Sequence, residues 1–507
     1  MRWSSVSALV AAIFSAPALA ACQDRAPVSA AVSSITEADV ARRVAILAHD
    51  SMRGRSTLRP EIETVARYIA SEFRRLGLKP GGDGGDFIQR YSVERVRLDP
   101  VASSISVAGS TTWRFGTDVL YPPFLPVADM DRSARLAIIS GIPDTAAPPE
   151  VKDRALLVVL PAGIDNALAD IDRILFSWSR AGAVAVMIPV SLADSSWRRM
   201  AERQDQFRTQ RSWDGGEIPL LWVREQAAAK LLAAQGIDLA SLARARHKAQ
   251  AVATPLDVSI KIRRQVASSL SPPNVVGILE GSDPQLKNEY VVFSAHMDHV
   301  GVGRPDATGD TIYNGADDNA SGTTAILELA EAFSLLAPRP KRSLIFLTVS
   351  GEEMGLWGSD YFTSNPPVPL SQLVADLNAD MIGRNWKDTI VVIGKEHSDL
   401  GQTLARVSAR HPELRMAPID DLWPEERFFF RSDHFNFARR GVPALFFFNG
   451  VHGDYHRPGD EAHKIDAEKA SRVIKLIFYL GLEIANAPSR PRWNPESYRV
   501  IVQGAER

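Results

Sequence analysis

Six short apolar runs in the C-terminal half of the chain alternate with helical patterns, and this alternation constrains the fold most strongly. The runs are rich in Val, Ile, Leu and Phe, as is typical of strands buried on both faces of a sheet. The strand runs are 275–279, 291–295, 344–349, 374–378, 390–393 and 444–448, and the helical segments are 321–336, 401–410 and 467–487. The pattern predicts an α/β fold with a mostly parallel sheet that has helices on both faces.

Polar clusters follow several of these strand runs or open the helix after one. His296 and Asp298 end the run at 291–295, and they are two residues apart, so in an extended chain they point the same way. The other clusters are Asn-Gly-Ala-Asp-Asp-Asn-Ala-Ser-Gly at 314–322, Ser-Gly-Glu-Glu at 350–353, Asn-Ala-Asp at 378–380 and Asp-Tyr-His at 454–456. Each cluster alone could be a helix cap, a turn or a loop. Because ligands bind beyond the carboxyl ends of parallel strands, the clusters together predict one shared site.

The residue types in these clusters suit a divalent metal such as zinc, which binds imidazole nitrogens and carboxylate oxygens. If one carboxylate is shared, the set divides into two sites with three ligands each. Two metals about 3.5–4 Å apart can hold a bridging hydroxide and polarise a carbonyl oxygen. One further carboxylate must stay uncoordinated to move the proton. The neighbours Glu352 and Glu353 offer one carboxylate for each task, because adjacent residues that leave a strand point in different directions.

The order of the motifs resembles that of the co-catalytic zinc aminopeptidases of the bacterial leucyl aminopeptidase type. Wider relatives of that family include glutamate carboxypeptidase II, the transferrin receptor and the glutaminyl cyclases. His-x-Asp, Asp-Asp-Asn-x-Ser-Gly, Glu-Glu, Asn-x-Asp and Tyr-His occur here in the family's order, and the resemblance covers nearly all of the mature chain.

The resemblance implies a role for each matching residue. Asp318 would bridge two zinc ions, with Asp317 as the competing candidate, and Glu352 would be the general base. The remaining roles would be Glu353 and His456 as ligands of one metal, His296 and Asp380 as ligands of the other, Asp298 as the brace of His296, and Tyr455 as either the donor to the oxyanion or a buried packing ring. The further histidines His299, His434 and His452 are expected to be pocket or structural residues.

The rest of the chain divides into segments of different texture. Residues 35–109 are expected to be the N-terminal part of the peptidase domain, with helical patterns over 37–78 and no catalytic chemistry. Residues 110–254 read as a small α/β or mostly β module that resembles the inserted protease-associated domain, and its polar stretch 197–216 is expected to be a solvated loop or helix. Residues 255–490 would be the catalytic domain, and 491–507 a C-terminal tail.

The N-terminus has the pattern of an export signal. Arg2 precedes an apolar run that is too short to span a bilayer, and small residues follow it, so residues 1–22 predict a signal peptide. The segment Leu-Ala-Ala-Cys ends at Cys22, the only cysteine of the chain, and resembles a bacterial lipobox. Residues 23–34 would be a tether. The alternative is ordinary signal-peptidase cleavage near residue 20. The protein is therefore expected to be exported, as a periplasmic or outer-membrane-anchored lipoprotein or as a secreted protein.

The function predicted by these observations is an exported zinc-dependent aminopeptidase that acts on peptides. The chain has 58 Lys and Arg residues and 60 Asp and Glu residues, so it lacks the excess of positive charge that is typical of nucleic-acid-binding proteins. Three alternatives stay open. They are a related carboxypeptidase with a cationic pocket supplied by Arg384, Arg431 or Arg457, a glutaminyl cyclase with a single zinc, and a receptor-like scaffold without activity.

Overall fold

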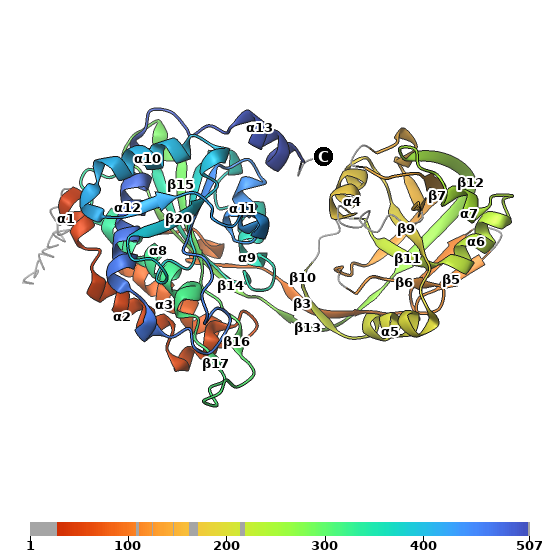
Figure 1. Cartoon of the computed structure of the whole chain (residues 1–507), viewed down its shortest axis with the longest axis horizontal. Coiled ribbons are helices and arrows are strands. Elements are labelled where there is room, and N and C mark those ends of the chain that lie inside the picture. Colours follow the sequence, from red (N-terminus) through yellow and green to blue (C-terminus); the bar gives the residue numbers. More distant parts are fainter. Residues whose placement is uncertain are drawn as a thin grey trace, which may run out of the picture.

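The chain folds into two lobes that are joined by a narrow connection (Figure 1). The computed structural model describes residues 28–107, 111–123, 125–144, 147–161, 171–212 and 218–504. The larger lobe contains a nine-stranded sheet and the smaller lobe an eight-stranded sheet. The three strands between the lobes form a separate ladder, with β10 (Arg208–Arg211) and β13 (Arg264–Leu270) on either side of β3 (Val93–Leu98). The predicted signal peptide, residues 1–22, lies outside the described residues.

All six strands predicted in the C-terminal half are confirmed within the sheet of the larger lobe. In spatial order this sheet consists of β1 (Lys79–Pro80), β14 (Pro273–Leu279), β18 (Ser343–Val349), β15 (Tyr290–His296), β19 (Leu373–Ala379), β22 (Ala444–Phe448), β20 (Thr389–Ile393) and β21 (Ala417–Ile419), and β2 (Ile88–Arg90) also pairs with β14.

The direction of the strands corrects the predicted mostly parallel sheet, because the sheet is mixed. The central strands β18, β15, β19 and β22 are parallel to their neighbours in this group, whereas β14 runs antiparallel to β18 and β20 antiparallel to β22. A continuous apolar run shows that a strand is buried on both faces, but it carries no information on its direction.

Helices cover both faces of this sheet, as the alternating pattern predicts. One apolar core joins the sheet to α1 (Val28–Ser33), α2 (Glu37–Leu47), α3 (Glu61–Arg75), α8 (Gly322–Ser334), α10 (Leu400–Arg410) and α12 (Ala467–Asn486). The opposite core contains residues of α9 (Trp357–Ser364) and α11 (His434–Ala438). None of the helices in the described part of the chain has the length and hydropathy needed to cross a membrane.

The described parts of the expected tether and of the expected C-terminal tail pack against the larger lobe. Part of the expected tether is helix α1, and its Ala31 and Val32 are buried in the core of the larger lobe. The expected C-terminal tail contains helix α13 (Pro495–Tyr498), and Ile501 and Val502 are buried against the other face of the sheet. In both segments, a few apolar residues within a polar stretch hold the chain against the larger lobe.

The smaller lobe is an α/β unit that extends beyond the predicted limits of 110–254. In spatial order its sheet consists of β5 (Thr111–Arg114), β4 (Ser104–Val107), β12 (Gln250–Ile262), β7 (Met130–Ser140), β8 (Arg154–Val159), β9 (Ala185–Val190), β11 (Leu220–Arg224) and β6 (Val119–Leu120), and its helices are α4 (Ile171–Arg180), α5 (Asp194–Gln204), α6 (Glu225–Ala233) and α7 (Leu239–Leu242). The stretch 197–216, expected to be a solvated loop or helix, contains most of helix α5, although Trp197 is buried, and also strand β10. Residues 213–216 of this stretch lie outside the described residues.

The register of the central strands brings the polar clusters to one edge. His296 pairs with Val349 in the parallel ladder, so residues 350–353 follow directly beside His296. Ser294 pairs with Asn378, so Asp380 leaves the sheet at the same end. Helix α8 starts close to this edge, because a Cβ atom added at Gly322 would lie only 2.1 Å from the backbone oxygen of Ala379.

This close approach predicts that Gly322→Ala destabilises the fold. The added methyl group meets backbone that cannot rotate away, so we expect a loss of about 1–3 kcal/mol of unfolding free energy. The measurement is thermal unfolding followed by circular dichroism. Gly453→Ala is the matched control, since an added Cβ there has no neighbour within 4 Å. Equal melting temperatures for the two variants would contradict the packing described here.

Candidate metal centre

Asp318, Glu353 and His456 form the first group of candidate ligands. The Nε2 atom of His456 lies 3.1 Å from Asp318 Oδ2 and 3.1 Å from Glu353 Oε2. This nitrogen is buried and makes no hydrogen bond among the described residues. Ligand atoms about 2.0–2.2 Å from a tetrahedral zinc ion are about 3.3 Å apart, so the three atoms fit a shared cation.

His296 and Asp380 form the second group together with the other oxygen of Asp318. His296 Nε2 lies 3.3 Å from Asp318 Oδ1 and 3.4 Å from Asp380 Oδ1. His296 Nδ1 lies 3.2 Å from the carbonyl oxygen of Asp298, to which it can donate, and this leaves Nε2 free to bind a metal. The second oxygen of Asp380 accepts a hydrogen bond of 2.8 Å from Ser432.

The placement of Asp318 separates it from its competitor Asp317. One oxygen of Asp318 faces each ligand group, which is the position of a bridging carboxylate. Asp317 points elsewhere, because its Oδ1 accepts a 2.6 Å hydrogen bond from the backbone nitrogen of Gly383 and its Oδ2 lies 3.4 Å from His452 Nε2. The peptide bond between Asp318 and Asn319 is cis.

Glu352 and Tyr455 lie in the same pocket as the second ligand group. Oxygen and nitrogen atoms of Glu352, His296 and Asp380 lie within 4.8 Å of one another. The Tyr455 ring stacks on His456 with 3.9 Å between the ring centroids, and it lines the pocket together with Glu352. Burial raises the pKa of the Glu352 carboxyl group well above its usual range, and Asp380, Asp433 and Glu353 add to this.

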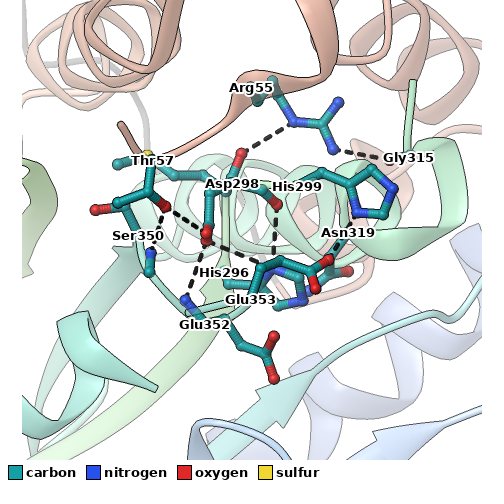
Figure 2. A network of polar contacts seen from close by, with 12 residues as sticks. Arg55, Thr57, His296, Asp298, His299, Gly315, Asn319, Ser350, Glu352 and Glu353 are labelled. Atoms are coloured by element: carbon teal, nitrogen blue, oxygen red, sulfur yellow. Dashed lines mark hydrogen bonds and ion pairs between the residues drawn. The ribbon is translucent and has the colours of Figure 1, made fainter. Parts of the chain in front are cut away.

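Asp298 and two residues of the N-terminal segment, Thr57 and Arg55, brace the loops that carry the ligands (Figure 2). Asp298 is fully buried, with Oδ1 3.7 Å from His296 Nδ1 and Oδ2 accepting a 2.5 Å hydrogen bond from Thr57. The Thr57 hydroxyl in turn accepts a 2.9 Å hydrogen bond from the backbone nitrogen of Gly351, beside Glu352. One threonine thus connects the loop after β15 to the loop after β18.

Arg55 is a buried cation that sequence reasoning missed. Its guanidinium donates to the carbonyl oxygens of Met297 at 2.9 Å, Asn314 at 2.5 Å and Gly315 at 2.8 Å. Burial lowers the pKa of Arg55 to about 10, although nearby carboxylates led by Asp318 oppose this. Arg55 therefore ties the segment of His296 to the segment of Asp318. No local motif marks it, because its role depends on contacts more than 240 residues away in the chain.

The remaining histidines have separate roles. His299 lies beside the first ligand group, since its Nδ1 lies 2.8 Å from Glu353 Oε1 and 3.7 Å from Asp318 Oδ2. It contacts the Glu353 oxygen that faces away from His456, so it can orient that carboxylate by a hydrogen bond. His434 packs between Phe429 and Phe446, where burial lowers the pKa of its imidazole to about 3. The geometry gives His299 a closer link to the metal ligands than the sequence predicts.

The electrostatics of this edge favour cations. Burial alone would raise the pKa of Asp318, but the imidazoles of His299, His296 and His456 hold it well below its usual value. Burial opposes protonation of His456, yet Asp318 and Glu353 raise its pKa to about 10. A field that stabilises protonated imidazoles also stabilises a bound metal ion.

The fold and the site define a class: an α/β protein with two adjacent candidate metal-ligand groups at one edge of its sheet. Residues 274–481 match the model of peptidase family M28. The matched range contains every residue of the two ligand groups.

Known proteins similar to this chain are described as zinc metalloproteases or aminopeptidases. A probable zinc metalloprotease of Leptosphaeria maculans is 26% identical over 258 residues, which cover 43% of this chain and 58% of the relative. A probable leucine aminopeptidase of Arthroderma otae is 27% identical over 223 residues, which cover 42% of this chain and 58% of the relative. The chain spans about half the length of the relatives it matches. The solved structure of an aminopeptidase from Aneurinibacillus sp. strain AM-1 has 19% identity and a TM-score of 0.47, and the match covers 92% of this chain and 98% of that one.

The ligand geometry predicts that His296→Ala and His456→Ala each lower the zinc content of the purified protein. Losing a residue that only hydrogen-bonds a ligand weakens metal binding about 10–100-fold, so losing a ligand itself should cost at least as much. The measurement is mass spectrometry of zinc after dialysis at limiting zinc. His463→Ala, which replaces an exposed histidine, is the control. Unchanged zinc content in both ligand variants would show that the metal binds elsewhere.

Proposed function

We propose that this protein is a zinc-dependent aminopeptidase that binds two zinc ions and removes N-terminal residues from peptides. One observation carries the proposal. Each of the two carboxylate oxygens of Asp318 faces a different ligand group, and Glu352 lies in the same pocket. The names of the relatives and the family match of residues 274–481 agree with this activity. Bound zinc ions would polarise the substrate carbonyl and make a water molecule more acidic.

Glu352 serves in this proposal as the base and then as the acid. Its raised pKa suits a group that takes a proton from water and passes it to the leaving nitrogen. The backbone nitrogen of Glu352 donates to Asp298 Oδ1 at 3.4 Å, which ties its position to the ligand loop. Tyr455 remains protonated, because burial raises its pKa further, and its hydroxyl would donate to the carbonyl oxygen as negative charge develops there.

A carboxypeptidase of the same family is the second candidate. Of the three arginines that could form a cationic pocket, Arg431 lines the pocket of Glu352. Arg384 is already paired with Asp454 at 2.9 Å, and Arg457 is exposed. Comparison of free-amine peptides with their N-acetylated forms separates the two activities, since only a carboxypeptidase cleaves the acetylated form.

Zinc counting addresses the glutaminyl cyclase alternative, which uses a single zinc ion. Contacts of 3.1–3.4 Å among the five proposed ligands count against the receptor-like alternative.

The proposal predicts that Glu352→Gln abolishes most hydrolysis and leaves the zinc bound. A correctly placed general acid–base contributes about 10²–10⁴-fold to the rate, so kcat for aminoacyl chromogenic substrates should fall by that factor. Glu353→Gln is the matched control, as it should lose zinc together with activity. A Glu352→Gln enzyme with wild-type kcat would remove Glu352 from this role.

Two further assignments belong to the same proposal. The smaller lobe is proposed to be a protease-associated domain, by its β-rich sequence and its position within the peptidase chain. Residues 1–22 are proposed to direct export, with lipid attachment at Cys22 after cleavage; the sequence of the segment supports this. Metabolic labelling with radioactive palmitate tests the lipid, and Cys22→Ser should abolish the label.

A further inference from the structure

A second hollow lies between the two lobes, next to the metal centre. It has a volume of about 570 Å³, within the range of about 300–1,000 Å³ typical of ligand sites. Pro123, Leu125 and Pro126 of the smaller lobe and strand β10 line one side, and α9 and α11 of the larger lobe line the other. Its apolar wall includes Trp357, Phe430 and Phe435.

The hollow is rich in arginine. Asp360 is the only acidic residue among those that line it, and it is paired with Arg211, Arg439 and Arg440, the last at 3.1 Å. Arg208 lines the hollow as well. The three lining arginines, Arg208, Arg211 and Arg439, and the single lining carboxylate leave two positive charges that the lining residues do not balance.

Arg208 is the least satisfied of these cations. It donates one hydrogen bond of 3.2 Å to the carbonyl oxygen of Pro123, and it lies 5.7 Å from the centroid of the Tyr121 ring. Its Nε and Nη2 atoms are buried and have no hydrogen-bond partner in the described part of the chain. A buried guanidinium with two free donors is costly unless an anion pairs with it, and its planar fork matches a carboxylate. The Nε atom of Arg439 is also buried without a partner there.

The hollow is adjacent to the metal centre along the chain and in space. Met354, which follows the proposed ligand Glu353 directly, lines the hollow. The segment 428–431 contributes Phe428 and Arg431 to the pocket of Glu352 and Phe430 to the hollow. A peptide with its N-terminus at the metals therefore needs few further residues to reach the arginines, since an extended chain advances about 3.3 Å per residue.

We propose that this arginine-lined hollow binds a carboxylate of the peptide substrate, above all the C-terminal carboxylate of a short peptide. The inference rests on the proposed function, because it places the substrate N-terminus at the metal centre. The ladder between the lobes thereby contributes directly to substrate choice through Arg208 of β10, and the enzyme selects oligopeptides by their length. An acidic side chain of a longer peptide offers the same chemistry.

The test compares Leu-Ala, Leu-Ala-Ala and Leu-Ala-Ala-Ala as free acids and as C-terminal amides, using the full-length zinc-loaded protein. The readout is the ratio of kcat/KM for acid and amide within one protein sample, which does not depend on the fraction that is folded. A hydrogen-bonded charge pair supports a preference of about ten- to hundredfold at the best length. Arg208→Gln and Arg208→Ala should bring the ratio close to one. Arg198→Ala, which removes an exposed arginine of helix α5, should keep it.

A further arm compares amides that carry Asp or Asn at the third position. If wild type prefers Asp and loses this preference in Arg208→Gln, the hollow takes a side-chain carboxylate. Equal rates for acid and amide at every length, together with no preference for Asp, would overturn the proposal. If wild type cleaves none of these peptides, the proposed peptidase function fails first. The same acid-to-amide ratio is then read from binding affinities by calorimetry, and equal affinities would overturn the carboxylate site.

Discussion

The crowding of carboxylates at one edge of the sheet is the constraint on which the rest of the structure depends. Asp298, Asp318 and Asp380 are buried there, and Glu352 and Glu353 are half-buried beside them. Such a group of like charges is unfavourable unless cations or hydrogen bonds offset it. Arg55 supplies one fixed positive charge, and the three neighbouring imidazoles contribute further charge when protonated. Two divalent ions between these ligands would satisfy the site.

The parallel centre of the sheet makes this crowding possible. Strands β15, β18 and β19 end at the same edge, so residues from three distant segments meet without long loops. The N-terminal segment completes the arrangement from outside the sheet, with Arg55 holding two ligand loops by their carbonyl oxygens and Thr57 holding Asp298. The ligand positions are thus set by backbone that is itself fixed by hydrogen bonds, which is what a preorganised metal site requires.

The sequence predicted the strands and the convergent clusters because both leave local signals. Runs such as 344–349 are apolar on both faces, and His296 and Glu353 stand where strands end. It did not reveal Arg55 and Thr57, because arginine and threonine in a short polar turn have no pattern that distinguishes them from solvated residues. For the same reason the arginines of β10 read as a solvated stretch. Their significance appears only when the smaller lobe is placed against α9 and α11. Strand direction was equally hidden, since burial on both faces does not depend on it.

The most direct test of this account is crystallography of the zinc-loaded protein with anomalous data collected on either side of the zinc absorption edge. The account predicts two anomalous peaks about 3.5–4 Å apart, one on each side of Asp318. One peak should lie against His456 and Glu353, and the other against His296 and Asp380. A single peak, or peaks away from Asp318, would contradict the claim that these buried carboxylates exist to hold a pair of metal ions.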